Sequence, residues 1–366
     1  MSELLETPLA HVHTALGARM VEFGGWNMPV QYADGIIAEH THTRTEAAIF
    51  DICHMGEFRV KGPGAAEGLD GALARAVANM KVGICRYNFL LNEEGGVLDD
   101  LIVYRLAEDE FYIVVNAATT AADAEILKSR LPDTVTFTDE SDATAKIDLQ
   151  GPKAAEALAS LGIDVTTLPL YYKWDYICIE NTDMLISRTG YTGELGYEFY
   201  LPAEKAEWFW NLLSSIDFVK PAGLGARDTL RLEMGYPLYG HEMDPETTPM
   251  EAGFGGMLKP GRTFVGDCIH TNETRKNLVG LQLDGRRAAR EGTPVFNTNE
   301  EQVGIVTSGS FSPILKTSIA MAMLDAGAST ELGTDYLLGK APKYMTAKVV
   351  DMPFYKDFTA RVKLGE

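Results

Sequence analysis

The sequence predicts an α+β protein in which a larger mixed region precedes a small β domain. Through the first 270 residues, helical spacing and short strands alternate without a regular βαβ repeat. From Lys276 onward, short β-rich runs alternate with turn residues and helical spacing almost disappears. A length of 366 residues fits two or three domains. We therefore expect a mixed region over 1–270 and a small barrel or sandwich over 276–366, with the hinge between Cys268 and Lys276.

The elements of the mixed region follow from the spacing of its apolar residues. Helices are predicted at 35–49, 63–78, 121–130, 154–161 and 204–216. Strands are predicted at 57–61, 87–91, 101–106, 111–116, 176–180 and 184–188. The acidic turn at 107–110 joins two of these strands, which predicts a hairpin. In the second region, strands are predicted at 278–283, 304–307, 318–324 and 345–350.

Composition excludes several classes of function. The chain has 46% hydrophobic and 23% charged residues, which is ordinary for a globular protein. No apolar run approaches the 18 or so residues of a membrane span, and the amino terminus has neither a secretory nor a transit pattern. A formal net charge of -20 disfavours generic binding to nucleic acid or to an anionic membrane. We expect a cytoplasmic protein.

Cysteine and histidine spacing predicts no metal site. The four cysteines, at 53, 85, 178 and 268, are widely spaced, and we expect reduced thiols in the core. The two His-x-His pairs, at 11–13 and 40–42, have no cysteine or third ligand at a recognisable spacing. We interpret them as surface or helix-packing histidines.

The segment 92–106 carries two adjacent carboxylates, Asp99 and Asp100, where a glycine turn leads into an apolar strand. Aspartate is a poor strand former and is costly to bury, so its presence here needs a reason. Because side chains alternate along a strand, Asp100 shares a face with Tyr104, and we expect one aspartate to face the interior and the other water. A carboxylate among apolar groups and beside a like charge can act as an acid or base near neutral pH. Simple decoration of a turn is the alternative that this segment leaves open.

Two further stretches have an unusual choice of residues. Residues 188–201 predict a turn with three glycines between two strands, and Glu198 enters the second strand. Such a turn lets the backbone approach a ligand closely, but a hairpin without a ligand explains the glycines equally well. Residues 221–233 predict a loop that opens a helix around Gly225; the third glycine of a dinucleotide fingerprint is missing. Arg227 falls in the first turn, where a cation is unfavourable, so we expect a buried carboxylate or an anionic ligand beside it.

Taken together, these residues resemble the aminomethyltransferase family of the glycine cleavage system, the T-proteins. The motifs that carry the resemblance are Thr7-Pro-Leu9, Phe23-Gly-Gly-Trp-Asn-Met-Pro29, Phe50-Asp-Ile-Cys-His-Met-Gly56, Gly95-Gly-Val-Leu-Asp-Asp100, Gln150-Gly-Pro152, Arg188-Thr-Gly-Tyr-Thr-Gly193, Gly223-Leu-Gly-Ala-Arg-Asp228, Tyr239-Gly-His-Glu-Met243, Thr307-Ser-Gly309, Ser312-Pro313 and Met352-Pro-Phe-Tyr355. Each motif is weak alone, but their order and spacing cover nearly the whole chain. Enzymes that oxidise sarcosine or dimethylglycine and several folate-dependent demethylases share the fold and part of this set.

The resemblance implies a three-domain cloverleaf around a central channel that holds tetrahydrofolate, with a β-barrel as the C-terminal domain. It implies transfer of the one-carbon unit from an aminomethyl group on the lipoyl arm of a partner, the H-protein, to tetrahydrofolate, with release of ammonia and without a metal. It also implies that Asp100 is the acid–base or charge-stabilising carboxylate. The residues implied to bind folate are Tyr87, Tyr104, Asn116, Glu198 and Arg227, with Met55, Tyr191 and Tyr236 as neighbours.

Three residues depart from the pattern of the family. Gly256 stands where members often have Trp, which leaves open how the outer part of folate is held. Lys316 stands where Gly is usual, and Cys53 where Ser is common.

Two questions stay open on the sequence alone. An arginine cluster at 286, 287 and 290 has two interpretations. Its charge attracts either the folate glutamate tail or an acidic carrier protein, or the arginines only belong to a solvated loop. The alternative functions are a folate-dependent demethylase acting on another small methylated donor and a non-catalytic folate-binding accessory protein. Retention of Asp100 argues against the accessory protein, because binding alone does not need the acid.

Overall fold

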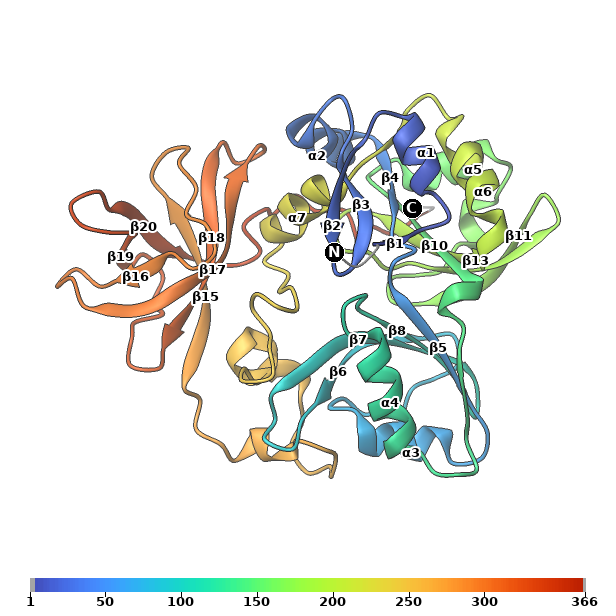
Figure 1. The fold of residues 1–366 in the computed structure, drawn as a ribbon, viewed down its shortest axis with the longest axis horizontal. Helices are drawn as coiled ribbons and strands as arrows, with labels where there is room; N and C mark the ends of the chain where they lie inside the picture. Colours follow the sequence, from blue (N-terminus) through green and yellow to red (C-terminus); the bar gives the residue numbers. More distant parts are fainter. Residues whose placement is uncertain (1–3, 365–366) are drawn as a thin grey trace.

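A computed structural model describes residues 4–364, which form three lobes (Figure 1). The chain builds part of the first lobe, passes into the second lobe, returns to complete the first, and then runs through a linking segment into a C-terminal barrel. Figure 1 shows the barrel on one side and the two mixed lobes, one above the other, on the opposite side. The α+β fold with three domains is therefore confirmed.

The first lobe is built on a six-stranded sheet in the order β11-β12-β13-β10-β4-β14. Its strands are β4 (Ala47–Asp51), β10 (Thr144–Gln150), β11 (Trp174–Ile179), β12 (Thr182–Ser187), β13 (Gly196–Pro202) and β14 (Val219–Pro221). Three helices pack on one face of this sheet: α1 (Ala10–Ala15), α5 (Ala154–Ser160) and α6 (Ala206–Ser214). On the other face, α7 (Leu224–Glu233) packs against β4 and against α2 (Ile36–Thr45). A small sheet of β1 (Leu5–Glu6), β3 (Trp26–Gln31) and β2 (Arg19–Phe23) lies beside them.

The second lobe holds an antiparallel sheet in the order β6-β7-β8-β5-β9. Its elements are β5 (Gly56–Lys61), α3 (Ala65–Ala72), β6 (Cys85–Leu91), β7 (Val97–Ala107), β8 (Glu110–Val115), α4 (Thr120–Arg130) and β9 (Thr136–Asp139). Leu101 and Val103 pack under α3 and α4, whereas Tyr104, from the opposite face of β7, packs against Tyr200 of the first lobe. The sheet therefore presents one face to its own helices and the other to the centre of the molecule.

The C-terminal domain is a closed barrel, as predicted, rather than a sandwich. Its strands follow the order β15-β18-β17-β16-β19-β20. They are β15 (Lys276–Leu283), β16 (Pro294–Phe296), β17 (Gln302–Ser312), β18 (Thr317–Asp325), β19 (Asp335–Leu338) and β20 (Met345–Val350). Short helical turns at Met250–Phe254, Gly255–Met257 and Asp267–His270 precede the barrel, and the first and last of them pack on the second lobe. We propose that the domain boundary lies between residues 270 and 276.

Two predicted helices are longer than the real ones. The helix predicted over 35–49 ends at Thr45, because Ala47 and Ala48 pair in β4 with β14 and β10. The helix predicted over 63–78 ends at Ala72, and Leu73 is extended and bridges to Leu90. Alanine has high helix propensity, but pairing within the sheet outweighs it at these positions. Across residues 4–364, no helix is long and apolar enough to cross a membrane.

Candidate active site

The turn that precedes the paired aspartates is fixed by two glycines. Gly95 has a φ of +87°, a conformation that side chains disfavour. A Cβ on Gly96 would lie 1.8 Å from the Pro245 carbonyl oxygen, so only glycine allows this approach. The amide of Val97 then donates to the carbonyl oxygens of Asp244 and Thr247, each at 3.0 Å. The start of β7 is thereby held against the linking segment.

Asp100 is half-buried at the centre of the molecule and is held by neutral donors. The Tyr87 hydroxyl donates to one carboxylate oxygen at 2.9 Å, and the Asn116 amide donates to the other at 3.0 Å. Burial and the neighbouring Asp99 raise the pKa of Asp100 to about 7, although the bonds from Tyr87 and Asn116 oppose the rise. Asp100 can therefore gain or lose a proton near neutral pH.

The prediction that one of the two aspartates faces water is wrong. Asp99 lies on the face covered by α4 and has no exposed surface. Its two oxygens accept from the Asn116 side chain at 2.8 Å and from the Asn116 backbone at 2.9 Å. Burial and the nearby Asp123 of α4 hold the pKa of Asp99 well above its usual range. Alternation along β7 was predicted correctly, but the opposite face is covered by a helix rather than by solvent.

A second polar cluster lies on the sheet of the first lobe. Glu198 of β13 stands directly opposite Asp148 of β10, and both carboxylates are buried. Lys146 lies 3.1 Å from Glu198, and Arg227 lies 2.8 Å from Asp148. Burial alone would raise the pKa of Glu198, but Lys146, a bond from Thr189 and Arg227 together hold it below its usual range. The buried carboxylate predicted beside Arg227 is thus present.

Tyr104 supports this cluster from the second lobe. Its hydroxyl lies 2.8 Å from the Tyr200 hydroxyl and 3.2 Å from that of Ser187. Ser187 in turn bonds to Thr189 at 2.6 Å, and Thr189 donates to Glu198. Since Tyr104 has no exposed surface, it lies behind Glu198 within the hydrogen-bond network.

The remaining predicted residues lie around these two groups. The Met55 sulfur is 3.3 Å from the Lys146 ammonium. Tyr191 stacks on Tyr236 with ring centres 5.8 Å apart, and the Arg227 guanidinium lies 5.2 Å from the Tyr191 ring. Burial raises the pKa of Tyr191, and the charge of Asp100 adds to the rise while Arg231 and Arg227 oppose it. Tyr191 therefore lies beside Arg227 and near enough to Asp100 to feel its charge.

Sequence reasoning missed four residues of this region. Lys146 and Asp148 were not singled out, although charged residues inside an apolar strand are the same signal that identified Asp99 and Asp100. Met243 and Phe254 of the linking segment were also missed. They contact Tyr87, with the Met243 sulfur 4.0 Å from the hydroxyl and the Phe254 ring 5.4 Å from the Tyr87 ring.

The three departures from the family pattern have local explanations. A Cβ on Gly256 would meet no atom within 4 Å, so the position is open. Lys316 has a φ of +57°, the left-handed conformation that explains why Gly is usual there. The Cys53 thiol donates to the Lys146 carbonyl oxygen at 3.3 Å, as a serine hydroxyl would.

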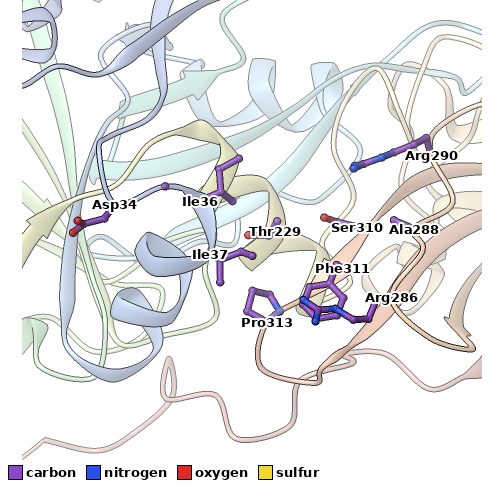
Figure 2. A pocket seen from close by; sticks show the side chains of 11 residues that line it. Asp34, Ile36, Ile37, Thr229, Arg286, Ala288, Arg290, Ser310, Phe311 and Pro313 are labelled. Atoms are coloured by element: carbon purple, nitrogen blue, oxygen red, sulfur yellow. The ribbon is translucent and has the colours of Figure 1, made fainter.

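Two members of the arginine cluster, Arg286 and Arg290, border a cavity of about 540 Å³ between the start of α2 and the barrel (Figure 2). Ile36 and Ile37 come from α2, and Arg286 and Arg290 come from the barrel. The Arg286 guanidinium lies 4.6 Å from the Phe311 ring. None of the predicted folate-binding residues lines this cavity.

The cysteines and histidines fall into several environments. All four cysteines are free thiols, but Cys178 is exposed on β11 and Cys268 is half-buried, so the prediction that all four lie in the core is wrong. His13 and His40 are buried against acidic partners, whereas His11 is exposed. Within residues 4–364, no group of three or more potential ligands is arranged to hold a metal.

Similarity to known proteins agrees with this geometry. The family described as "GCVT N-terminal domain" matches residues 9–261, and "Glycine cleavage T-protein C-terminal barrel domain" matches residues 276–356. An aminomethyltransferase of Listeria monocytogenes is 42% identical over 363 residues, which cover 97% of this chain and 99% of that protein. One of Cutibacterium acnes is 43% identical over 372 residues, which cover 97% and 100%. The crystal structure of glycine cleavage system aminomethyltransferase T from Bartonella henselae superposes with a TM-score of 0.90 at 35% identity, over 96% of this chain and 98% of that one. The chain therefore belongs to the aminomethyltransferase family of the glycine cleavage system, as its motifs predicted.

Proposed function

We propose that this aminomethyltransferase takes the one-carbon unit from an aminomethyl group on the lipoyl arm of H-protein, passes it to tetrahydrofolate and releases ammonia. The product would be 5,10-methylenetetrahydrofolate. We also propose that the protein is cytoplasmic.

The state of Asp100 is the observation that carries this proposal. Its carboxyl is held by Tyr87 and Asn116, lies next to buried Asp99, and has a pKa of about 7. A positive charge develops on the transferred carbon as its bond to sulfur breaks. An ionised carboxylate fixed beside that carbon stabilises the charge, and fixed groups act most strongly where water is excluded.

The polar cluster around Glu198 fits a reduced pterin ring. The edge of such a ring presents several N–H donors, which require buried acceptors. Glu198 stays ionised, and Asp148 has one buried oxygen without a partner among residues 4–364. Tyr87, which bonds to Asp100, and Tyr191, which lies beside Arg227, offer flat faces for the ring. Bound tetrahydrofolate supplies the nitrogen that accepts the carbon; the protein orients it, and such positioning contributes a large share of the rate.

The test is transfer from aminomethylated H-protein to tetrahydrofolate, followed by ammonia release. Asp100→Asn should bind tetrahydrofolate normally and lose about 10²- to 10⁴-fold in turnover, the usual range for loss of an acid–base group. The exposed Asp142→Asn is the matched control. Near-normal turnover in Asp100→Asn would contradict the role of this carboxylate.

Alternative donors separate the rival functions. Turnover with sarcosine or dimethylglycine, but not with aminomethylated H-protein, would favour a demethylase. Binding of tetrahydrofolate without turnover from any donor would favour an accessory protein.

A further inference from the structure

The chain returns to the first lobe after it leaves the barrel. Residues 351–364 follow β20 without a further helix or strand, and we call them the C-terminal strap. Figure 1 shows the chain reaching the first lobe after the barrel. On its way the Tyr355 amide donates to the Glu233 carbonyl oxygen of α7 at 2.9 Å, and the Arg44 guanidinium of α2 lies 4.3 Å from the Tyr355 ring. The strap therefore connects the barrel to the helices of the first lobe.

The strap is bonded to one end of the turn that joins β12 to β13, residues 188–195. Arg188 opens this turn and is only 2% exposed. Its Nη2 donates to the Ala360 carbonyl oxygen at 3.0 Å and to that of Val362. A buried guanidinium is costly unless its N–H groups find acceptors. The strap therefore supplies acceptors for a buried cation that belongs to the turn.

The other end of the turn is held by Thr359 and Ala360. The Ala360 amide donates to the Gly193 carbonyl oxygen at 2.9 Å. The Thr359 hydroxyl accepts from the Leu195 amide at 2.8 Å and donates to the Glu194 carboxylate. Both ends of the turn are thus bound to the same short stretch of the strap, residues 359–362.

The middle of the turn is held from within the first lobe. The Gln150 amide donates to the Thr189 carbonyl oxygen at 3.2 Å, and the Thr192 hydroxyl donates to the Gln150 side-chain oxygen at 2.9 Å. Gly190 and Gly193, with φ of +155° and +81°, give the backbone little conformational preference of its own. The shape of the turn therefore depends on these bonds, from Gln150 at its middle and from the strap at its ends.

The turn carries two side chains of the proposed site. The Thr189 hydroxyl donates to Glu198, and the Tyr191 ring lies 5.2 Å from the Arg227 guanidinium. Glu198 belongs to β13 and Arg227 to α7, so regular structure holds both. Displacement of either end of the turn would move Thr189 and Tyr191 relative to these two residues. The contacts of the strap therefore bear on the geometry of the site.

We propose that the C-terminal strap is a positioning segment of the active site, with Thr359 as a positioning residue. By binding both ends of the turn, the strap sets the positions of Thr189 and Tyr191 before the ligand arrives. Thr359 acts through the turn and not on the substrate. The inference rests on the proposed function, because its effect on the reaction requires tetrahydrofolate in the site that these two side chains border.

Thr359→Val keeps the shape of the side chain and removes the hydroxyl that bonds to Glu194 and to the Leu195 amide. Because small displacements of positioning groups are costly to the rate, kcat/KM for tetrahydrofolate should fall about 10- to 100-fold. The pH–rate profile should keep its shape, since Asp100 lies on β7 of the second lobe. Thr359→Ser restores the hydroxyl and should recover most of the activity. The matched control is Thr330→Val, at an exposed position of the barrel domain.

Hydrogen exchange measures the contact between strap and turn directly. Without ligand, peptides covering residues 188–195 should exchange faster in Thr359→Val than in the wild-type protein, whereas peptides from β7 should not change. Coupling between two parts of a protein is reciprocal, so a ligand that the strap helps to bind must also strengthen the contact of the strap. Tetrahydrofolate should therefore slow exchange of the wild-type Ala360 amide, which bonds to Gly193.

The outcomes separate the inference from the proposed function. Normal kcat/KM in a folded Thr359→Val overturns the inference, and so does an equal loss in Thr359→Ser. Should Thr359→Val fail to fold, the wild-type protein decides, because unchanged exchange at Ala360 on binding of tetrahydrofolate also overturns the inference. A wild-type protein that binds no tetrahydrofolate refutes the proposed function and the role of the strap together.

Discussion

Replacing Asp100 by asparagine should stabilise the folded protein at pH 8, although it removes most turnover. The pKa of Asp100 is raised from 3.8 to about 7, first by burial and then by Asp99. The native state therefore keeps this proton up to about pH 7, whereas the unfolded chain loses it near pH 4. Since unfolding releases a proton between these values, the free energy of unfolding falls as pH rises from about 4 to 7.

The size of the effect follows from that difference. About three pKa units at 1.36 kcal/mol each correspond to about 4 kcal/mol at pH 8. Asp100 is only half-buried, so water reduces this figure. The amide NH₂ of the new asparagine faces either Tyr87 or Asn116, both of which donate to Asp100. A donor then faces a donor, which lowers the free energy of unfolding by about 1–2 kcal/mol. The net gain should be about 2 kcal/mol at pH 8 and about zero at pH 5.

Urea unfolding at pH 5 and pH 8 measures this change. The exposed Asp142→Asn serves as the control and should change stability by less than about 0.5 kcal/mol at both values. Loss of stability in Asp100→Asn at pH 8 would refute the reasoning. An equal change at the two pH values would show that the carboxylate charge is not its cause.

Three further changes test other parts of the structure. Tyr87→Phe removes a hydroxyl bond that lowers the pKa of Asp100, so the acid limb of the pH–rate profile should move to higher pH; an unmoved limb would count against this contact. Arg44→Met removes the arginine that the buried Glu194 and Glu233 share and should cost about 3–5 kcal/mol in urea unfolding; a loss below about 1 kcal/mol would contradict a strong contribution from these ion pairs. Lys316→Gly relieves a left-handed backbone and should leave Tm unchanged or raise it, corresponding to at most about 1 kcal/mol; a clear fall in Tm would contradict this explanation.

Local rules predicted the strand that carries Asp100. Alternation along β7 placed Asp100 with Tyr104 and apart from Asp99, because side-chain direction in a strand depends only on position. The same rule says nothing of what covers each face. The helix that buries Asp99 lies about twenty residues further on, and its packing depends on the whole second lobe. The expectation that one aspartate faces water failed for this reason.

The cluster around Asp148 shows a second limit of sequence reasoning. Arg227 was predicted to need an anionic partner, since a cation is unfavourable at a helix start. That partner is 79 residues earlier in the chain, and no spacing rule connects the two positions. The strand pairing that sets Asp148 opposite Glu198 is likewise a property of the folded sheet. The chemical need was thus readable from the sequence, whereas the residue that meets it was not.

Asp100 and Asp148, whose pKa values burial raises to about 7, have different partners, which supports different roles. Asp100 is held by the hydroxyl of Tyr87 and the amide of Asn116, and within residues 4–364 no cation forms an ion pair with it. Its charge, when present, is therefore available to a positive reacting group. Asp148 is bound to Arg227, so its charge is compensated within the protein. Because the two residues stand on different sheets, the protein can keep an uncompensated carboxylate at one place and a compensated one at the other.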